Sequence, residues 1–442
     1  MNKSIFITAT FLLLISVSVS RGAQEEEALS WNECVREAKK NNPDLLSSAF
    51  QVEQAEANVG KSRSPLLPQI KGSLSTARSK SSGSEAGDTY AYSLSASQLI
   101  FDGLKSWYEL DQSEQSLVIS RLNYDSESAD IRLGLRDAFI NLLKAQELIG
   151  VTEDIAGRRK QQLELVRLRY EAGREHRGSL LTSEANLAQA EFDIAQAVRD
   201  VWVARKQLNK EMGRKTFKPI KADGSLDPTG IPESEPDLER LMESNPSVLA
   251  QAVEKESARL NVAIARGDFF PTISGSASIG RSDSDWPPKD ERWNVGVSLS
   301  LPLYEGGSRL DEVTRSKAAL REAEENERSE RDSVLLSLEE AWVDLENAHE
   351  RVGVQKKFLE ATEERARISE VQYATGLLSF DNWIIIEDDL VRVKKTYLQS
   401  RATAQQADAR WINARGGTLD FIPGHSDQIH TKSEQSAASG ER

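Results

Sequence analysis

The chain has 442 residues, which is enough for more than one domain, and its formal net charge is −14. This acidic balance argues against a nucleic-acid-binding protein, because phosphates require a basic surface. Cys34 is the only cysteine, so the chain forms neither an internal disulfide nor a cysteine-based zinc site.

The N-terminus carries a targeting pattern. Lys3 precedes an uncharged run from Ser4 to Ser20 that is rich in Ile, Leu, Phe and Val. We interpret residues 1–23 as a signal peptide, with an uncleaved membrane anchor as the alternative. No later segment approaches the ~18 consecutive apolar residues of a membrane helix, so any further membrane insertion must use strands.

Two units of the same design follow, and each is expected to contain a helical start, two strands, a very long helix and a return helix. In the first unit, 28–213, the strands and long helix are expected at about 69–80, 90–101 and 104–172. In the second unit, 236–417, they are expected at about 272–281, 293–304 and 309–375. Neither long segment contains proline, and at 1.5 Å per residue each helix would be ~100 Å long.

A constant offset relates the two units. Subtracting 203 from a residue number places Asn245-Pro246 on Asn42-Pro43 without any insertion, which predicts two similar structures. Residues 214–235 contain several prolines and are interpreted as the linker between the units. The segment 418–442 is interpreted as a disordered tail.

The expected strands alternate between apolar and small polar side chains. Rows of Ser and Gly suit the lumen of a wide pore, whereas a solvated sheet would carry Lys and Glu. The expected lumen residues are Ser73, Ser75, Ser95, Ser97, Ser274, Ser276, Ser298 and Ser300. The expected lipid-facing residues are Ile70, Tyr90, Tyr92, Leu94, Ile273, Trp293, Val295, Val297 and Leu299. An ordinary hairpin on a soluble core is the alternative.

The number of strands predicts an oligomer. Edge strands exposed in a bilayer leave unpaired backbone groups that cost several kcal/mol each, so a membrane sheet must close. Four strands per chain are too few, because the smallest single-chain barrels use about 8. Two copies would give about 8 strands and a filled interior, whereas three would give about 12 and a hollow one. The Ser and Gly faces favour three copies.

Short motifs recur in the same order in both units. They are the two Asn-Pro pairs, Leu66-Leu-Pro-Gln-Ile70, Phe269-Phe-Pro-Thr-Ile273, Leu99-Ile-Phe-Asp-Gly103, Leu303-Tyr-Glu-Gly-Gly307, Arg169-Tyr-Glu-Ala-Gly173 and Gln372-Tyr-Ala-Thr-Gly376. In this order, and twice over, these motifs resemble those of the outer membrane efflux protein (TolC-like) family over about residues 29–417. The resemblance implies a mainly α protomer with a membrane β-barrel: a homotrimer with a 12-stranded barrel in the outer membrane and a long α-helical barrel in the periplasm.

The resemblance also implies partners and a site. The partners would be a periplasmic membrane-fusion (adaptor) protein and an inner-membrane pump of the RND, ABC or MFS type. The family's gate and adaptor contact lie at the helix tips, which here correspond to Tyr170, Gly173, Arg174, Glu175, Ser179, Tyr373, Gly376, Leu377, Leu378, Asp381 and Asn382. The usual tip carboxylates are replaced by Ser179 and Asn382, which are the expected N-caps of the return helices. Glu175, Asp381 and Glu387 are the remaining candidates for tip acids.

No catalytic, cofactor-binding or metal-binding constellation is recognisable, so the chain is not expected to be an enzyme. His349 is interpreted as a packing residue near the helix seam. The leading hypothesis is a passive exit duct for drugs or other small molecules in a tripartite efflux system of a Gram-negative-type outer membrane. Type I protein secretion and metal export are alternatives within this class. A periplasmic coiled-coil scaffold without a pore is the alternative from another class.

Overall fold

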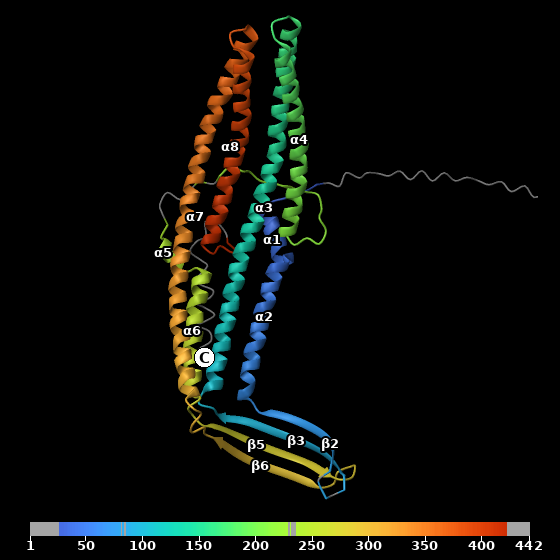
Figure 1. Cartoon of the computed structure of the whole chain (residues 1–442), viewed down its shortest axis with the longest axis vertical. Helices are drawn as coiled ribbons and strands as arrows, with labels where there is room; N and C mark the ends of the chain where they lie inside the picture. The colour runs from blue at the N-terminus through green and yellow to red at the C-terminus, as the bar shows by residue number, and fades with distance from the viewer. Residues whose placement is uncertain (1–25, 81, 84, 229, 231–235, 422–442) are drawn as a thin grey trace, which may run out of the picture.

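The chain forms an elongated molecule with a β-sheet at one end and two helical hairpin tips at the other (Figure 1). A computed structural model describes residues 26–80, 82–83, 85–228, 230 and 236–421. The expected signal peptide and residues 422–442 of the expected tail lie outside this range. None of the helices in the described part combines the length and the apolarity that a membrane-spanning helix needs.

Three of the four pairs of corresponding helices keep the offset of 203 to within one residue, whereas the pair formed by the first helix of each unit does not. They are α1 (Trp31–Asn41), α2 (Pro43–Arg63), α3 (Lys105–Glu171), α4 (Arg177–Glu211), α5 (Leu238–Glu243), α6 (Pro246–Gly267), α7 (Ser308–Thr375) and α8 (Phe380–Ala414). The strands are β1 (Glu27–Leu29), β2 (Gln69–Ser79), β3 (Gly87–Phe101), β4 (Ile220–Ala222), β5 (Thr272–Asp283) and β6 (Glu291–Ser300), and a 3-10 turn, η1, covers Ser64–Leu66.

Each Asn-Pro pair begins one helix and closes the end of another. The Oδ1 of Asn42 accepts hydrogen bonds from the backbone N–H groups two and three residues on, at 2.9 and 3.1 Å, and Pro43 occupies the first turn of α2. The Nδ2 of Asn42 donates to the carbonyl oxygen of Glu211, at the end of α4, at 2.9 Å. Asn245 repeats this contact with the carbonyl oxygen of Ala414 at 3.1 Å. The breaker in the sequence is therefore a tie between two helices of the same unit.

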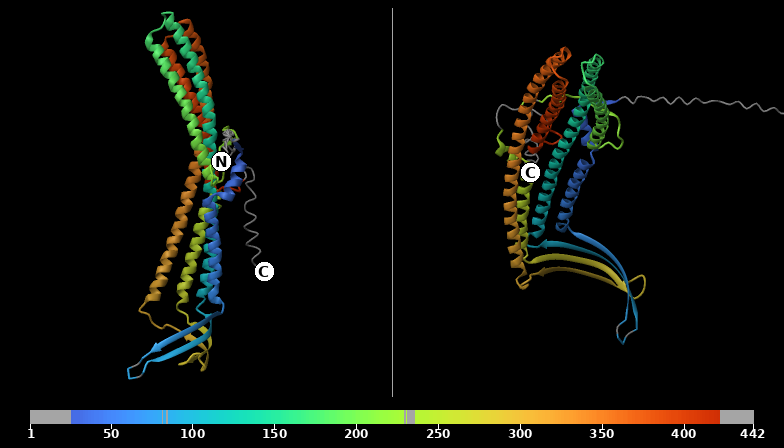
Figure 2. Two further views of the ribbon diagram at one scale, coloured as in Figure 1. Left: turned by 90° about the vertical axis from the view of Figure 1, so that its right-hand side faces the viewer. Right: turned by 45° about the horizontal axis from the view of Figure 1, so that its top comes forward.

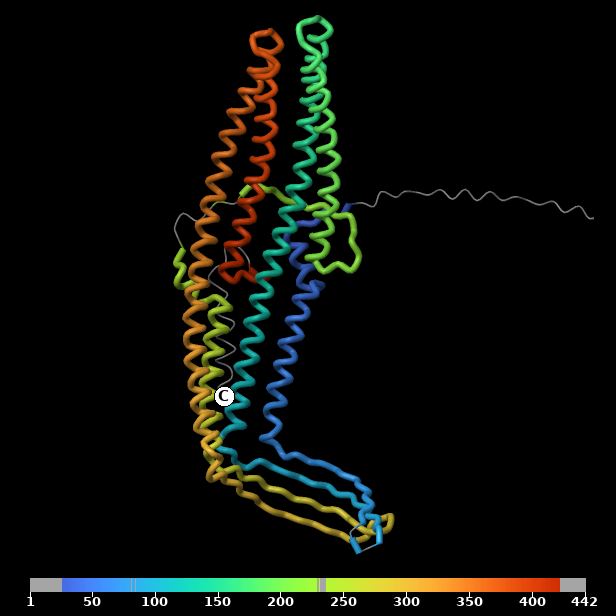
Figure 3. The backbone as a smooth tube through the Cα atoms, in the orientation of Figure 1, coloured from blue at the N-terminus to red at the C-terminus, as the bar shows by residue number. Residues whose placement is uncertain are grey.

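The helices form two rows, and in each row four helices lie side by side. Near the sheet the row is α2, α3, α6 and α7; near the tips it is α4, α3, α8 and α7 (Figures 1 and 3). The two further views agree with this arrangement (Figure 2). One edge of the molecule is thus formed by α2 and α4, and the opposite edge by α7.

The four longer strands form one antiparallel sheet in the order β2-β3-β5-β6. Leu94 pairs with Ile279, which pairs with Trp293, so an apolar row crosses the sheet. Ser274 pairs with Ser298, and their hydroxyl oxygens lie 2.8 Å apart. The register places all nine residues expected to face lipid on one face and all eight expected lumen residues on the other. Which face meets lipid stays a prediction.

The structure differs from three expected boundaries. The expected strand 293–304 is β6, which ends at Ser300, before Pro302 removes a backbone donor. The expected linker 214–235 contains β4, which pairs in parallel with β1. The expected tail 418–442 is wrong at its start, because Leu419 is buried in the main core.

An arginine–aromatic stack explains that last correction. The Arg132 guanidinium lies 5.3 Å from the ring centre of Phe421 and 5.6 Å from that of Trp31. The Arg415 guanidinium also lies near this ring, 5.1 Å from the ring centre of Phe421. Favourable contacts between cations and aromatic faces thus tie the residues after α8 to α1 and α3.

Candidate functional site

The hairpin tips are two tight turns, one between α3 and α4 and one between α7 and α8. Gly173 (φ 68°) and Gly376 (φ 85°) adopt the left-handed conformation that ends each long helix. The N-caps are His176 for α4 and Ser379 for α8, so the expected caps Ser179 and Asn382 are wrong. Both lie three residues further on, inside the first turn of their helices.

One hydrogen-bond cluster joins the two hairpins at the tips. The hydroxyl of Tyr373, on α7, donates to Glu175 Oε2 in the other turn at 2.8 Å. Ser179 Oγ donates to Glu175 Oε1 at 3.0 Å, and the backbone N–H of His176 donates to the same oxygen at 3.2 Å. Arg169, on α3, donates from Nη1 to the carbonyl oxygen of Tyr373 at 2.7 Å.

Tyr373 sits at the centre of a small aromatic core. Its side chain is fully buried, stacked on Trp383 with ring centres 4.2 Å apart and planes inclined by 15°. Phe380 meets it edge-on at 6.3 Å, and the Arg169 guanidinium lies 4.6 Å from its ring centre. Val166 contributes from α3. The hydroxyl that reaches Glu175 is therefore held by packing on both hairpins.

These contacts shift two ionisation equilibria. Burial opposes ionisation of Glu175, but hydrogen bonds from Tyr373, Ser179 and His176 outweigh it and hold the pKa of its carboxyl below the usual value. Burial, followed by the hydrogen bond to the Glu175 carboxylate, raises the pKa of the Tyr373 hydroxyl. The pair is thus a charged acceptor with a neutral donor at neutral pH.

The remaining expected tip residues are solvent-facing, except that Leu378 packs against the aromatic core of the tip. Leu377 is 82% exposed and Tyr170 is 38% exposed, and Leu378 is half-buried. Arg174, Asp381 and Asn382 are also exposed. The structure therefore brings Glu175, Ser179 and Tyr373 together and leaves the others, apart from Leu378, on the surface.

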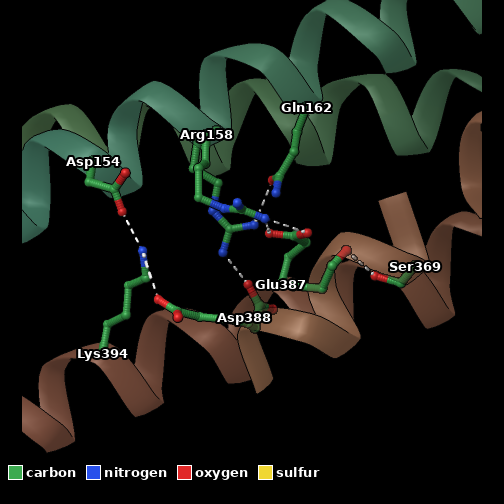
Figure 4. Close-up of polar contacts among 10 residues, drawn as sticks. Asp154, Arg158, Gln162, Ser369, Glu387, Asp388 and Lys394 are labelled. Atoms are coloured by element: carbon green, nitrogen blue, oxygen red, sulfur yellow. Dashed lines mark hydrogen bonds and ion pairs between the residues drawn. The ribbon is translucent and has the colours of Figure 1, made fainter. Parts of the chain in front are cut away.

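Glu387 does not line the tip but lies between α3 and α8, where it is 2% exposed (Figure 4). Arg158 Nη2 donates to both of its carboxylate oxygens, at 3.1 and 3.0 Å. The adjacent residues pair likewise, Arg159 with Asp388. We define this set of contacts, with those of the next paragraph, as the α3–α8 seam.

The α3–α8 seam continues away from the tips as ion pairs. Lys394 contacts Asp154 (Figure 4), and Arg401 Nη1 donates to Glu147 Oε2 at 2.7 Å. Sequence reasoning missed every member except Glu387. Charged residues are frequent on both helices, and a single sequence carries no signal for which of them face each other across the seam.

A metal site does not emerge from the part of the chain that is described, since no group of three or more His, Cys, Asp or Glu residues converges there. His349 Nε2 lies 3.1 Å from Asp408 Oδ1 between α7 and α8. Cys34 is fully buried, and burial raises the pKa of its thiol to about 12.

Comparisons with known proteins agree on one family. The family model described as outer membrane efflux protein matches residues 34–214 and 238–417. Outer membrane efflux protein BepC of Brucella suis is 23% identical over 383 residues, covering 86% of this chain and 83% of its own length. Outer membrane protein TolC of Escherichia coli is 23% identical over 389 residues, covering 82% and 77%. A crystal structure of CusC superposes with a TM-score of 0.79 at 17% identity, over 87% of this chain and 91% of CusC.

Proposed function

The chain belongs to the outer membrane efflux protein family and is an efflux duct of the outer membrane that reaches into the periplasm, and we propose that three copies form it. In this proposal the sheets close into one barrel, the helices continue it as a tube, and the hairpin tips form a gate. Conduction is passive, and drugs or other small molecules are the proposed cargo.

The two open edges of the sheet carry the proposal. β2 and β6 each pair with one strand of the described chain and leave their outer backbone groups unpaired. The helices share these edges, with α2 and α4 on the β2 side and α7 on the β6 side. β6 of one copy can therefore pair with β2 of the next, and three four-stranded sheets give a barrel of about 12 strands that leaves no edge in lipid.

The contact between Tyr373 and Glu175 supports a gate at the tips. It links the α3/α4 hairpin to the α7/α8 hairpin at the end of the tube farthest from the sheet. We name it the tip latch. Separation of the hairpins breaks the tip latch, so its strength biases the tube toward the closed form.

The exposed tip residues support docking of a periplasmic adaptor that connects the duct to an inner-membrane pump. Leu377 presents an apolar side chain in one turn and Arg174 a cation in the other. The proposed pump supplies the energy, since the chain is proposed to have no enzymatic activity of its own.

Reconstitution tests the duct. The detergent-extracted protein is expected to have the mass of three chains and to give discrete channels in a planar bilayer. A coiled-coil scaffold would give neither. A monomer that stays soluble without detergent would rule out the duct.

Substitutions at the tips test docking separately. Arg174→Asp combined with Leu377→Asp is expected to abolish export in cells while leaving channel formation by the purified protein intact. Lys160→Asp, at an exposed position on α3 about 16 Å along the helix from its end at the tip, is the control and should not reduce export. Full export by the double variant would contradict adaptor docking at these residues.

A further inference from the structure

Two exposed stripes run along opposite edges of the helical part. On α4, Phe192 and Arg199 follow the buried Ala190 and Ala197 by two residues. At 100° per residue they lie about 200° around the helix, nearly opposite the side that packs on α3. Phe192 is 55% exposed although it is a large aromatic residue.

The stripe on α7 has the same construction. Val343 and Glu350 precede the buried Leu345 and Val352 by two residues, so they point away from α8. Phe358 is 57% exposed and lies about 80° around α7 from Glu350, at the flank of this face. Each edge of the molecule therefore presents an apolar helix face that nothing in the described chain covers.

The two stripes match in height, as the rise of an α-helix shows. Phe192 lies ~23 Å along α4 from its start at Arg177, and Phe358 lies ~26 Å along α7 from its end at Thr375. Measured from the same two helix ends, Arg199 lies at ~33 Å and Glu350 at ~38 Å. Each pair therefore differs in height by less than one helical turn.

The two edges also carry opposite charge at this height. Residues 199–218 on the α4 edge contain seven cations and two acids. Arg205 and Arg214 pair with Glu26, Glu27 and Glu37, so the net charge of this edge with those three acids included is +2. Residues 339–351 on α7 contain five acids and one cation, a net charge of −4. Within the described chain neither Arg199 nor Glu350 has an ion-pair partner, and the Arg199 guanidinium lies 5.7 Å from the centre of the Phe192 ring. Complementary fields of this kind favour and orient association.

A groove lies beside Arg199. It has a volume of about 530 Å³ and is lined by Trp202 and Phe217 together with the cations Arg199, Lys206 and Lys218. An acidic helix face with apolar residues fits such a lining, and α7 offers one at the matching height.

We propose that α7 of a second copy occupies this groove, with Phe358 against Phe192 and Glu350 against Arg199. The inference rests on the proposed trimer, and it adds the register of the seam between copies. The seam is continuous with the open sheet edges, because α4 lies above β2 and α7 above β6. It also differs in kind from the α3–α8 seam inside each copy, which consists mainly of ion pairs.

Cysteine pairs test the register in the full-length protein in detergent. In a Cys34→Ala background, Phe192→Cys with Phe358→Cys is expected to give covalent dimers and trimers with a short bismaleimide. Phe192→Cys with Leu336→Cys is the matched control. Leu336 is 56% exposed on the same face of α7, but it lies ~33 Å farther from the tip along the helix. This control should give no covalent oligomer.

Charge exchange supplies a second test that does not depend on cross-linking. Arg199→Glu and Glu350→Arg should each lower the ratio of trimer to monomer about tenfold, because each places like charges across three seams. The double variant should restore the ratio to within about threefold. A native trimer without the 192–358 cross-link and without rescue overturns the register and leaves the duct standing. Absence of any trimer overturns both, and capture of a different protein by Phe192→Cys in cells assigns the groove to that protein instead.

Discussion

Replacing Tyr373 by Phe removes one hydroxyl from the tip latch and leaves its packing in place. The ring keeps its stack on Trp383 and its contact with Arg169, so the tip core is retained. The Glu175 carboxylate loses the donor at 2.8 Å and keeps those from Ser179 and His176. The expected effect is therefore on the separation of the two hairpins and not on folding of either one.

The magnitude follows from the burial of the pair. Tyr373 is fully buried and the Glu175 side chain is 10% exposed, so solvent screens their contact little. A hydrogen bond to a charged group contributes about 1.5–3 kcal/mol, and removal of a neutral donor falls near the lower value. In three copies that open together, the closed form would lose about 4.5 kcal/mol of stabilisation. This loss shifts the equilibrium toward the open form roughly a thousandfold.

Single-channel recording in planar bilayers at neutral pH measures this shift as a rise in conductance and open time. Tyr170→Phe is the matched control. Tyr170 occupies the equivalent position in the first unit, but it is 38% exposed and makes no hydrogen bond through its hydroxyl within the described chain. Glu175→Gln should resemble Tyr373→Phe, and combining both should add little. Equal effects of Tyr170→Phe and Tyr373→Phe, or no effect of either, would refute the tip latch.

Three further outcomes are expected. Glu387→Ala should lower the free energy of unfolding by about 2–4 kcal/mol in thermal melts, because it leaves the Arg158 guanidinium without its partner in the α3–α8 seam. A loss below about 1 kcal/mol would mean that solvent screens this ion pair. Val295→Lys should reduce outer-membrane insertion, since a lysine at mid-bilayer costs about 2–4 kcal/mol. Ser276→Lys should insert normally and shift the selectivity of the channel toward anions. The reverse pattern would mean that the Ser276 face meets lipid and the Val295 face lines the lumen. The pKa of Glu175 is lowered by folding, so the latch is at full strength above the unfolded value of about 4.3 and weakens as the pH falls through the lowered one. Conductance should therefore rise only below about pH 4, and a change between pH 7 and 5 would contradict the assignment.

The strand pattern was readable because its period is short. Alternation in β5 and β6 assigns Val295 and Val297 to one face and Ser298 and Ser300 to the other before any partner strand is known, and the register agrees. The helix caps were less readable. Ser179 and Asn382 have suitable side chains, but the chain leaves the turn three residues earlier, at His176 and Ser379. Local preference cannot locate a cap that tertiary packing shifts by one turn.

In the tip site and the α3–α8 seam, too, some residues could be predicted from the sequence and their partners could not. Glu175 could be nominated from the sequence as an acid near the tip, but its partner Tyr373 lies 198 residues away in the other unit. Arg158 and Glu387 are likewise 229 residues apart. The motif pattern identified both turns, whereas only the packing of α3 on α8 decided which side chains meet.

By itself the amino-acid sequence determined the repeat, the long helices, the two-faced strands and the need for further copies. These features depend on periodicity along the chain and on the cost of unpaired backbone groups in lipid. The tertiary structure alone decided the long-range contacts: the Asn42 tie to α4 within the first unit, and, between the units, the docking of Leu419 and Phe421, the tip latch and the α3–α8 seam. Such contacts depend on the relative height and rotation of packed helices, which no local pattern of residues encodes.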